Sequence, residues 1–412
     1  MNAQHDNPAT MRPSRHEFHA LAAQHTVVPV WAEVLGDLET PVAAYLKLVG
    51  DGDGFLLESV EHAERWARYS FVGHDPVATL ELRDGLIEIK GQHLSADIPL
   101  DQGMLAALDA IIAAYRAPII PDLPPLQGGV MGYLGYDTIR EVEHLPHVPH
   151  DDRGFPDAVM SIIGSLAAFD HWRQRVYLIE SVPVLDMNTE AIDREYDEAC
   201  VRVQRAVDKL SQPLSSPAAE PPQLGEAAPE VRSSMADGVY QQAVEVAKEH
   251  ILAGDIFQVV LAQRYDIDLQ ADPFDFYRVL RQVNPSPYMY FLRHPDITIA
   301  GSSPEPMVKV LGRTVVSRPI AGTRRRGRTD DDDRRMAGEL KENPKEVAEH
   351  IMLVDLARND VGRVAEFGTV QVSELMSLER YSHVMHLTSQ VTGELVQGKT
   401  PIDVLRATLP AG

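Results

Sequence analysis

The stretch "ATLELRDGLIEIK", Ala78–Lys90, decides the fold class of this 412-residue chain. Apolar and polar residues alternate on both sides of Asp84-Gly85, a pair that favours a two-residue turn between antiparallel strands. Strands joined in this way form antiparallel sheets rather than the parallel sheets of βαβ folds. Two further hairpins are predicted, at 160–181 with a longer turn around 170–174, and at 307–320 with a turn at 311–313.

Helical patterns occur in blocks that are separate from these hairpins. Residues 189–210 place Ile192 and Tyr196 on one stripe, as an amphipathic helix does. The stretch 237–255 predicts another helix, in which Gly254 suits a left-handed C-cap. The segments that follow are predicted as a strand at 256–269 and a helix at 331–359 interrupted near Asn343-Pro344. Hairpins and helices in separate blocks indicate an α+β protein.

Composition excludes several classes of function. The formal net charge is −23, so the chain would repel nucleic acids and anionic membranes, and neither is expected as a partner. No uncharged run approaches the roughly 20 residues that span a bilayer, and the N-terminus lacks the apolar core of a signal peptide. The single cysteine, Cys200, excludes an intrachain disulfide framework and a cysteine-rich zinc site. We therefore expect a soluble, cytoplasmic protein.

The chain divides at a segment rich in proline, serine, alanine and glutamate, residues 210–234, which is typical of a linker or long surface loop. The predicted organisation is a disordered start at 1–17, an N-terminal region at 18–209, this linker, and a C-terminal domain at 235–412.

A cluster of arginines surrounds Gly322-Thr323 in "SRPIAGTRRRG", Ser317–Gly327. Arginine side chains bind carboxylates through two parallel hydrogen bonds, and a Gly-Thr turn can offer backbone N–H groups and a hydroxyl to the same anion. The cluster therefore predicts a site for a small dicarboxylate. The alternative is a solvated loop whose arginines pair with the acidic run 330–333.

Carboxylates line one side of the predicted helix in "KENPKEVAEHIMLVDLARND". At 3.6 residues per turn Glu342, Glu346 and Glu349 fall together, and the opposite side carries Val347, Ile351 and Val354. Hard oxygen ligands on one helix face suit Mg²⁺, which completes its shell with water and an anionic substrate. The alternative is an acidic stripe that faces solvent.

Two further places carry groups suited to acid–base chemistry. His383 and His386 lie three residues apart in "RYSHVMHLTSQV", and histidine is the usual acid or base near neutral pH, although a buried structural histidine fits the same pattern. Glu305 lies between two prolines in "AGSSPEPMVKV", where the fixed backbone would aim its carboxylate. The alternative for Glu305 is an ordinary proline-rich turn.

Together these segments resemble the large, chorismate-converting subunits of anthranilate synthases. The matching stretches run in the family's order from Leu56 almost to the end of the chain. They are "LLES", "RYSFVG", "GGVMGYLGYD", "GDIFQVVLAQR", "NPSPYMYFL", "GSSPE", "RPIAGTRRRG", "KEVAEHIMLVDLARND" and "RYSHVMHL".

The resemblance implies an α+β fold of two antiparallel sheets packed face to face with helices outside. It implies that Gly322 and Thr323 bind chorismate, and that Thr323 takes part in catalysis. Glu305 matches the carboxylate that protonates the leaving hydroxyl, and His386, rather than His383, matches the histidine of the elimination step. Glu349 matches a ligand of Mg²⁺.

The resemblance also implies partners. Ammonia would come from a glutamine amidotransferase subunit, and the products would be anthranilate and pyruvate in the first step of tryptophan biosynthesis. Tryptophan would act as feedback inhibitor at an allosteric site lined by four residues, namely Ser59, Pro287, Tyr288 and Met289.

Two alternatives remain at this point. Aminodeoxychorismate synthases are similar but carry a nucleophilic lysine where this chain has Ala321. In addition, the sequence stops at Leu405–Gly412, before the Ser-Gly-Ala-Pro-Lys block in which the family continues. The resemblance therefore implies a truncated chain whose C-terminal portion is missing and whose metal and chorismate binding is weakened. Such a chain could be a catalytically dead fragment that retains tryptophan binding.

Overall fold

A computed structural model describes residues 9–59, 68–91, 94, 97–214, 229–381 and 383–410. The chain forms two compact units, one of Met1–Pro217 with Leu280–Gly412 and the other of Ala218–Val279. Residues 1–8 of the predicted disordered start and residues 215–228 of the predicted linker lie outside the described residues.

The first unit contains a seven-stranded sheet in which every neighbouring pair of strands is antiparallel. Its strands, in spatial order, are β1 (Val27–Leu35), β9 (Arg175–Pro183), β8 (Ser165–Asp170), β3 (Tyr69–His74), β2 (Gly54–Glu58), β12 (Tyr288–His294) and β13 (Ile297–Ser303). The hairpin predicted at 160–181 is confirmed for residues 165–181, because β8 and β9 pair on either side of residues 171–174, whereas residues 160–162 belong to another sheet. Strands from distant parts of the sequence thus share one sheet.

A four-stranded antiparallel sheet contains the stretch that decides the fold class. Its order is β5 (Leu86–Gly91), β4 (Ala78–Arg83), β7 (Ala158–Ile162) and β6 (Val130–Leu134). The β4–β5 hairpin is confirmed, with Asp84 and Gly85 at φ values of 50° and 77°. These positive values are what a type I′ turn requires, and its twist matches that of the strands. Helix α3 (Met104–Ala114) contributes Met104, Leu105 and Leu108 to the core under this sheet.

The strands nearest the predicted site residues form a five-stranded sheet. They are β14 (Lys309–Leu311), β15 (Thr314–Ser317), β18 (Val384–Glu394), β16 (Ile320–Arg325) and β17 (Gln371–Arg380). The predicted turn at 311–313 is confirmed, because β14 and β15 pair around Gly312-Arg313. Strand β18 pairs with three others, β15, β16 and β17, so it is the central strand of this sheet.

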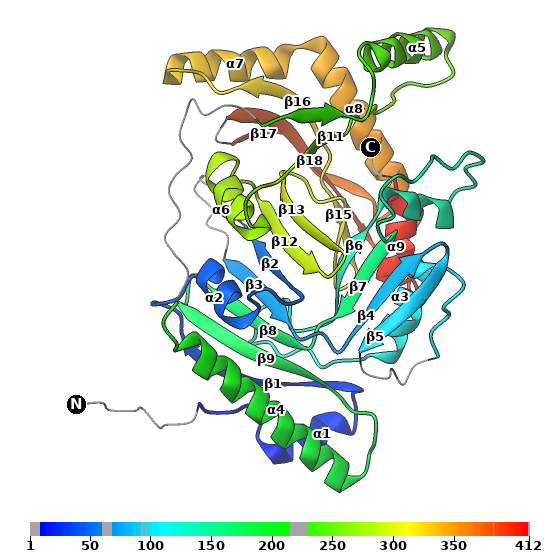
Figure 1. The fold of residues 1–412 in the computed structure, drawn as a ribbon. Helices are drawn as coiled ribbons and strands as arrows, with labels where there is room; N and C mark the ends of the chain where they lie inside the picture. The colour runs from blue at the N-terminus through cyan, green and yellow to red at the C-terminus, as the bar shows by residue number, and fades with distance from the viewer. Residues whose placement is uncertain are drawn as a thin grey trace. The chain divides into compact units, whose positions relative to one another are not determined.

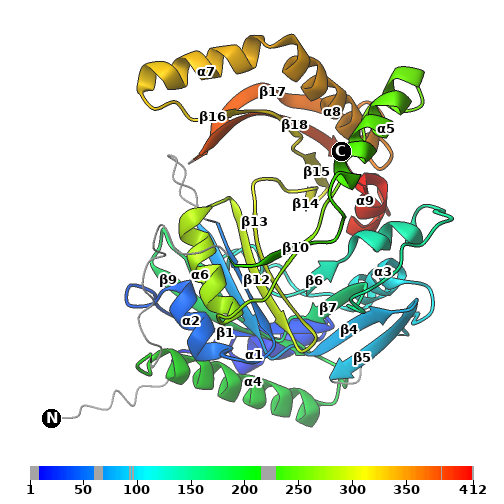
Figure 2. The same cartoon turned by 45° about the horizontal axis from the view of Figure 1, so that its top comes forward.

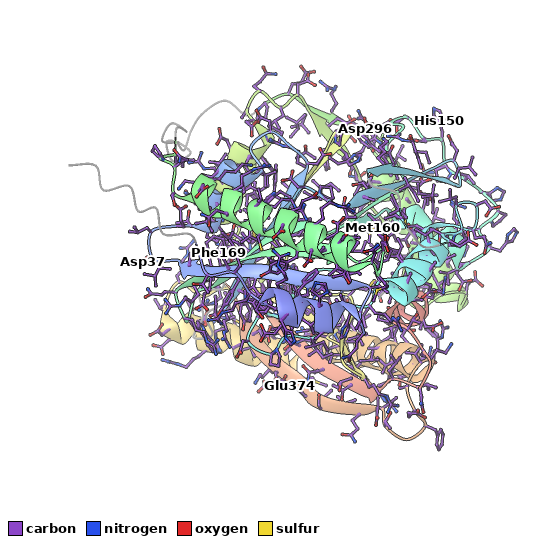
Figure 3. The ribbon with its side chains drawn as sticks, turned by 90° about the horizontal axis from the view of Figure 1, so that it is seen from below. Asp37, His150, Met160, Phe169, Asp296 and Glu374 are labelled. Atoms are coloured by element: carbon purple, nitrogen blue, oxygen red, sulfur yellow. The ribbon has the colours of Figure 1, made fainter. Side chains whose placement is uncertain are left out.

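Helices on the seven-stranded sheet follow the predicted periodicity. Helix α4 (Thr189–Leu210) has the predicted bounds and packs on β9 and β1 (Figure 1). Its buried residues include Ile192, Tyr196 and Ala199, the predicted stripe. Seen from below, α4 lies beside α1 (Arg15–Ala22) and β1 (Figure 3). Two further short helices of this unit are α2 (Pro41–Leu48) and the 3-10 helix η1 (Tyr136–Glu141).

Three helices accompany the five-stranded sheet: α7 (Asp330–Glu342), α8 (Pro344–Gly362) and α9 (Pro401–Thr408). Both α7 and α8 contact β16 and β18, and Figure 2 shows them on one side of the curved sheet. Asn343 is the C-cap of α7 and the N-cap of α8, where its side chain accepts hydrogen bonds from the first N–H groups of α8. The interruption predicted at Asn343-Pro344 is therefore confirmed.

The apolar face predicted for α8 is partly wrong. Val354 is buried in the core with Val315 and Val391, but Ile351 is 42% exposed. The buried stripe instead includes His350, because α8 is rotated so that this side chain reaches β18.

The second unit contains α5 (Val239–Ala253), which is capped by Gly254 in the left-handed conformation, as predicted. Helix α6 (Pro273–Val283) begins in this unit. The strand predicted at 256–269 is largely wrong, because only β11 (Tyr265–Ile267) forms, paired with β10 (Val231–Ser233). Residues 256–264 pair with no strand in the described part of the chain, and an isolated apolar stretch cannot satisfy its backbone as a strand.

The α+β class with antiparallel sheets and accompanying helices is confirmed by these elements. Among the described residues, no helix combines the length and the apolar character that crossing a bilayer requires.

Candidate active site

Strand β16 brings the predicted site residues together. Gly322 and Thr323 were predicted in a turn, but they lie inside this strand, where the pairing with β18 shifts register between Ala321 and Thr323. The shift is a β-bulge, and Gly322 occupies it at a φ of 76°. Only glycine adopts such a conformation readily, which explains why a Gly-Thr pair resembles a turn in the sequence.

His386 faces the bulge from β18. Its Nδ1 atom lies 3.0 Å from Thr323 Oγ1 and 3.3 Å from the carbonyl oxygen of Gly322. Since a carbonyl can only accept, the contact with Gly322 assigns the proton of the neutral ring to Nδ1 and leaves Nε2 with a lone pair. Burial lowers the pKa of His386, which favours this neutral form. The ring is thus prepared to accept a proton at Nε2.

Glu305 approaches the other end of the bulge. It follows β13 in a turn held by Ser303, whose Oγ accepts a hydrogen bond from the Glu305 amide. The Oε1 atom of Glu305 accepts a hydrogen bond of 2.9 Å from the amide of Ile320, two residues before Gly322. Part of the side chain is exposed, but desolvation of the carboxyl group outweighs this hydrogen bond and raises its pKa. A raised pKa suits a proton donor.

A cavity of about 360 Å³ opens beside Glu305. Arg318 also lines it, as do Asp360 near the end of α8 and Thr408 at the end of α9. This volume lies within the range of ligand pockets of small organic molecules. The cavity therefore places a carboxyl group with a raised pKa against a space in which a substrate could bind.

The arginines that suggested an anion site are mostly paired with protein carboxylates. Arg318 forms an ion pair with Glu379. Arg324 pairs with Glu346 at 3.0 Å and Arg326 with Asp333 at 2.7 Å. The Arg326–Asp333 pair is the one that the solvated-loop alternative anticipated. Exposed Arg325 and Arg328 have no ion pair within the described part of the chain.

The predicted face of three glutamates is reduced to two, because Glu342 ends α7 whereas Glu346 and Glu349 belong to α8. Glu346 lies against the bulge, since a Cβ added to Gly322 would stand 3.2 Å from Glu346 Oε2. Glu349 follows one turn later, and its carboxylate forms no hydrogen bond or ion pair with any of the described residues. A half-buried carboxylate without a protein partner fits a Mg²⁺ ligand, because that ion takes few carboxylates and keeps several waters.

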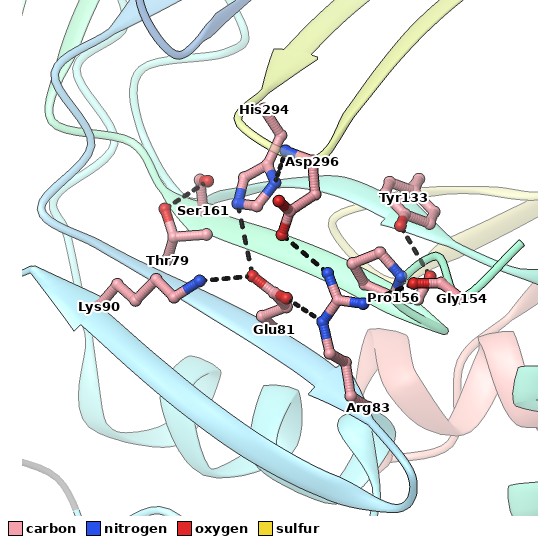
Figure 4. A network of polar contacts seen from close by, with 10 residues as sticks. All are labelled: Thr79, Glu81, Arg83, Lys90, Tyr133, Gly154, Pro156, Ser161, His294 and Asp296. Carbon is pink, nitrogen blue, oxygen red and sulfur yellow. Dashed lines mark hydrogen bonds and ion pairs between the residues drawn. The ribbon is translucent and has the colours of Figure 1, made fainter.

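Among the described residues, one group of potential metal ligands lies away from this site. It consists of Glu81, His294 and Asp296, whose ligand atoms are within 4.8 Å of one another. Figure 4 shows that Glu81 is already bound by Lys90 and Arg83, and that Arg83 also reaches Asp296 at 2.7 Å. Two cations therefore balance the two carboxylates. A divalent ion would add uncompensated positive charge, so these residues form an ion-pair network rather than a metal centre.

The four residues predicted to bind tryptophan lie at adjoining strand ends. Ser59 directly follows β2, and Tyr288 begins β12. Because Met289 pairs with Glu58 in this antiparallel ladder, the next pair of positions is Tyr288 and Ser59. Met289 is buried, while Tyr288 is 40% exposed. Pro287 precedes Tyr288, so the four residues are neighbours, and residues 60–67 after Ser59 lie outside the described residues.

His383 lies apart from the bulge. Its ring contacts the carbonyl of Val283 at 3.2 Å and is exposed. Of the two histidines, His386 is thus the one beside Gly322 and Thr323.

Two buried residues near the site were missed by sequence reasoning. His350, fully buried, lies 2.6 Å from the hydroxyl of Ser389, three residues beyond His386. Asp360 is 9% exposed and lines the cavity beside Glu305. The available signal was their spacing, because His350 and Asp360 repeat with Leu353 and Val361 at the period of a buried helix face.

Comparisons with known proteins show the family of the chain. A profile of the family described as "chorismate binding enzyme" matches residues 57–412. Curated relatives are named anthranilate synthase component 1. The one from Mycolicibacterium smegmatis is 42% identical over 406 residues, covering 97% of this chain and 77% of the relative. The one from Thermus thermophilus is 44% identical over 381 residues, covering 92% and 78%.

Solved structures are similar as well. The crystal structure of anthranilate synthase component I from Streptococcus pneumoniae superposes with a TM-score of 0.70 at 33% identity, covering 92% of this chain and 80% of that one. The menaquinone-specific isochorismate synthase from Escherichia coli has a TM-score of 0.62 at 12% identity, covering 96% and 78%, and so shares the fold. The resemblance inferred from the motifs is confirmed.

Proposed function

Because this chain belongs to the family of chorismate binding enzymes, we propose that it is the chorismate-converting component of an anthranilate synthase. In this proposal chorismate and ammonia become anthranilate and pyruvate, so the protein acts as a lyase. One observation carries the proposal. The bulge of β16 contacts His386 through Gly322 and Thr323, while Ile320 of the same strand holds Glu305.

The two titratable groups at this bulge suit opposite proton transfers. Glu305, with its raised pKa, would donate a proton to the ring hydroxyl of chorismate as ammonia adds and water leaves. His386, held neutral with its proton on Nδ1, would use Nε2 to take a ring proton as the enolpyruvyl group leaves as pyruvate. Thr323 would keep the imidazole in place.

Glu349 would hold Mg²⁺, supported by the absence of a side-chain partner among the described residues and by its place one turn after Glu346. When bound, the ion would supply positive charge for the ring carboxylate of the substrate. The bulge itself would offer chorismate the backbone and hydroxyl groups of Gly322 and Thr323.

The decisive experiment measures anthranilate fluorescence with chorismate, Mg²⁺ and excess ammonium chloride. We expect product from the wild-type chain, and a rate about 10²- to 10⁴-fold lower from His386→Ala because the base of the elimination is lost. His383→Ala is the matched control and should retain the wild-type rate. Equal loss in both variants, or no anthranilate from the wild type, would contradict the proposal.

We further propose that a glutamine amidotransferase subunit supplies ammonia and that tryptophan inhibits. The name "component 1" of the relatives supports a second component. The adjacency of Ser59 and Tyr288 at the β2–β12 ends supports one ligand pocket. Tryptophan should raise the thermal unfolding midpoint of the wild type but not of Ser59→Ala. Stabilisation by tryptophan without any turnover would instead favour a catalytically inactive tryptophan-binding protein.

Two further points complete the proposal. Ala321 is buried at the bulge, where an aminodeoxychorismate synthase would carry a nucleophilic lysine, so aminodeoxychorismate is not the expected product. The single free cysteine, Cys200, is compatible with the reducing cytoplasm, where we place the enzyme.

A further inference from the structure

The carboxyl group of Asp360 lacks the partners that a buried charge normally has. The residue is 9% exposed, and its side chain forms no hydrogen bond or ion pair with any residue that the structure describes. Burying a carboxylate without a partner is costly, so such a group is retained where a ligand neutralises it. Burial raises the pKa of Asp360. The positive charge of Arg363 lowers this pKa, but by less than burial raises it.

The position of Asp360 on its helix also favours binding of a cation. It lies in the last turn of α8, a helix of 19 residues that has no basic residue in that turn. The C-terminal end of a helix carries partial negative charge, which adds to that of the carboxylate. A cation bound there would be stabilised by both.

The cavity offers Asp360 no protein cation. Arg318 is the basic residue of the lining, and its guanidinium is paired with Glu379. The other carboxyl group of the lining belongs to Glu305, which holds the amide of Ile320. Thr408 Oγ1 donates to the carbonyl of Val404 at 2.9 Å, so its oxygen can still accept a hydrogen bond from a ligand.

We propose that Asp360 binds ammonium, the protonated form of the nitrogen nucleophile, in the cavity that it shares with Glu305. Ammonium has four N–H donors and a single charge, which matches one carboxylate and neighbouring hydroxyl acceptors such as Thr408. The single charge of ammonium balances the one carboxylate that remains when Glu305 carries its proton, whereas a divalent ion would leave a net positive charge in the cavity. To become a nucleophile, ammonium gives one proton to the Asp360 carboxylate, which yields neutral ammonia and a protonated Asp360.

This inference rests on the proposed function for its role in catalysis but not for the binding itself. Binding is tested by thermal unfolding in ammonium chloride and, at equal concentration, in potassium chloride. The wild type should unfold at a higher temperature in the ammonium salt, and Asp360→Asn should unfold at the same temperature in both. Asp355→Asn is the matched control, because Asp355 is exposed on the same helix and pairs with Arg358. Its response should equal that of the wild type.

The catalytic role is tested by steady-state kinetics with ammonium as the varied substrate. Asp360→Asn should raise KM for ammonium about tenfold while KM for chorismate stays unchanged, because one hydrogen bond to a charged group is lost. A structural role would instead alter both constants and kcat. The proposal is overturned if the variant keeps the wild-type response to ammonium, or if potassium stabilises the wild type equally. If the wild type forms no anthranilate but ammonium still stabilises it through Asp360, the proposed function fails and the binding site stands.

Discussion

At the scale of single residues, the opposite pKa shifts of Glu305 and His386 predict the pH dependence of activity. In the proposed reaction His386 must be neutral to accept a proton, and its pKa is lowered by burial, so kcat/KM should fall only when the pH drops below the ordinary histidine range. In the proposed reaction Glu305 must be protonated, and burial raises its pKa, so activity should decline as the pH rises through this raised pKa. Glu305→Gln should remove the alkaline limb of the profile and leave the acidic limb. An unchanged alkaline limb in that variant would assign the acid to another group.

Gly322 carries a second prediction at this scale. Gly322→Ala should lower the free energy of unfolding by about 1–2 kcal/mol, because alanine is strained at a φ of 76° and its Cβ would crowd Glu346 and Leu340. Anthranilate formation should fall with it, since the bulge holds Thr323 against His386. Gly338→Ala is the control: this helical glycine has open space around its missing Cβ, and alanine there should stabilise by about 0.5–1 kcal/mol. Chemical denaturation of both variants measures the difference.

At the scale of elements, Asp333 fixes the start of α7 to the strands of the site. Its carboxylate accepts hydrogen bonds from Arg326 at 2.7 Å, from the amide of Gly327 at 3.0 Å and from Arg380 at 3.0 Å. These donors, Arg326 first, hold the pKa of Asp333 well below its usual range. The stability that they contribute is therefore present above the ordinary aspartate pKa and is lost as the pH falls through the lowered one.

Replacing Asp333 tests this link between elements. Asp333→Asn should reduce the unfolding free energy at pH 7. The unfolding free energy of the variant should also fall less than that of the wild type as the pH is lowered, which denaturation at a series of pH values measures. Asp331→Asn, which removes an exposed carboxylate paired with Arg334 in the same helix turn, should leave both unchanged. If the two variants behaved alike, the helix start would not depend on Asp333.

At the scale of the whole molecule, the network in Figure 4 joins two sheets of the first unit. Glu81 of β4 in the four-stranded sheet shares Arg83 with Asp296, which lies in the turn between β12 and β13 of the seven-stranded sheet. Burial opposes ionisation of Glu81, but hydrogen bonds from Lys90 and Arg83 outweigh it and lower the pKa. The network is thus charged at neutral pH and ties the sheets together.

Glu81→Gln should lower the unfolding free energy by about 2 kcal/mol, because charged hydrogen bonds from Arg83 and Lys90 are lost at a buried position. The difference from the wild type should shrink as the pH falls below the ordinary glutamate pKa, where the unfolded chain gains its proton. Glu88 lies directly opposite Glu81 in the hairpin but is exposed, so Glu88→Gln should change stability little. A comparable loss in both variants would mean that the loss does not arise from the buried network.

Local signals in the sequence predicted the hairpins and helices well, because each depends on residues that are close along the chain. Asp84-Gly85 specifies its own turn, and the stripe containing Ile192 and Tyr196 specifies its own helix. The prediction at 256–264 was wrong because a strand needs a partner that no local pattern supplies. The prediction that Gly322 lies in a turn was wrong for a related reason. A glycine with a positive φ occurs in β-bulges as well as in turns, and only the pairing with another strand distinguishes them.

Local geometry and the intrinsic chemistry of the side chains are enough to specify the antiparallel hairpins, the break at Asn343-Pro344 and the residues able to do acid–base chemistry. Which of these residues lie together depends on the folded structure. Thr323 meets His386 across 63 positions of sequence, and Asp360 faces the cavity of Glu305. Register between β16 and β18, the rotation of α8 and the withdrawal of water from each carboxyl group depend on packing between distant segments. These factors set the pKa values on which the proposed chemistry rests.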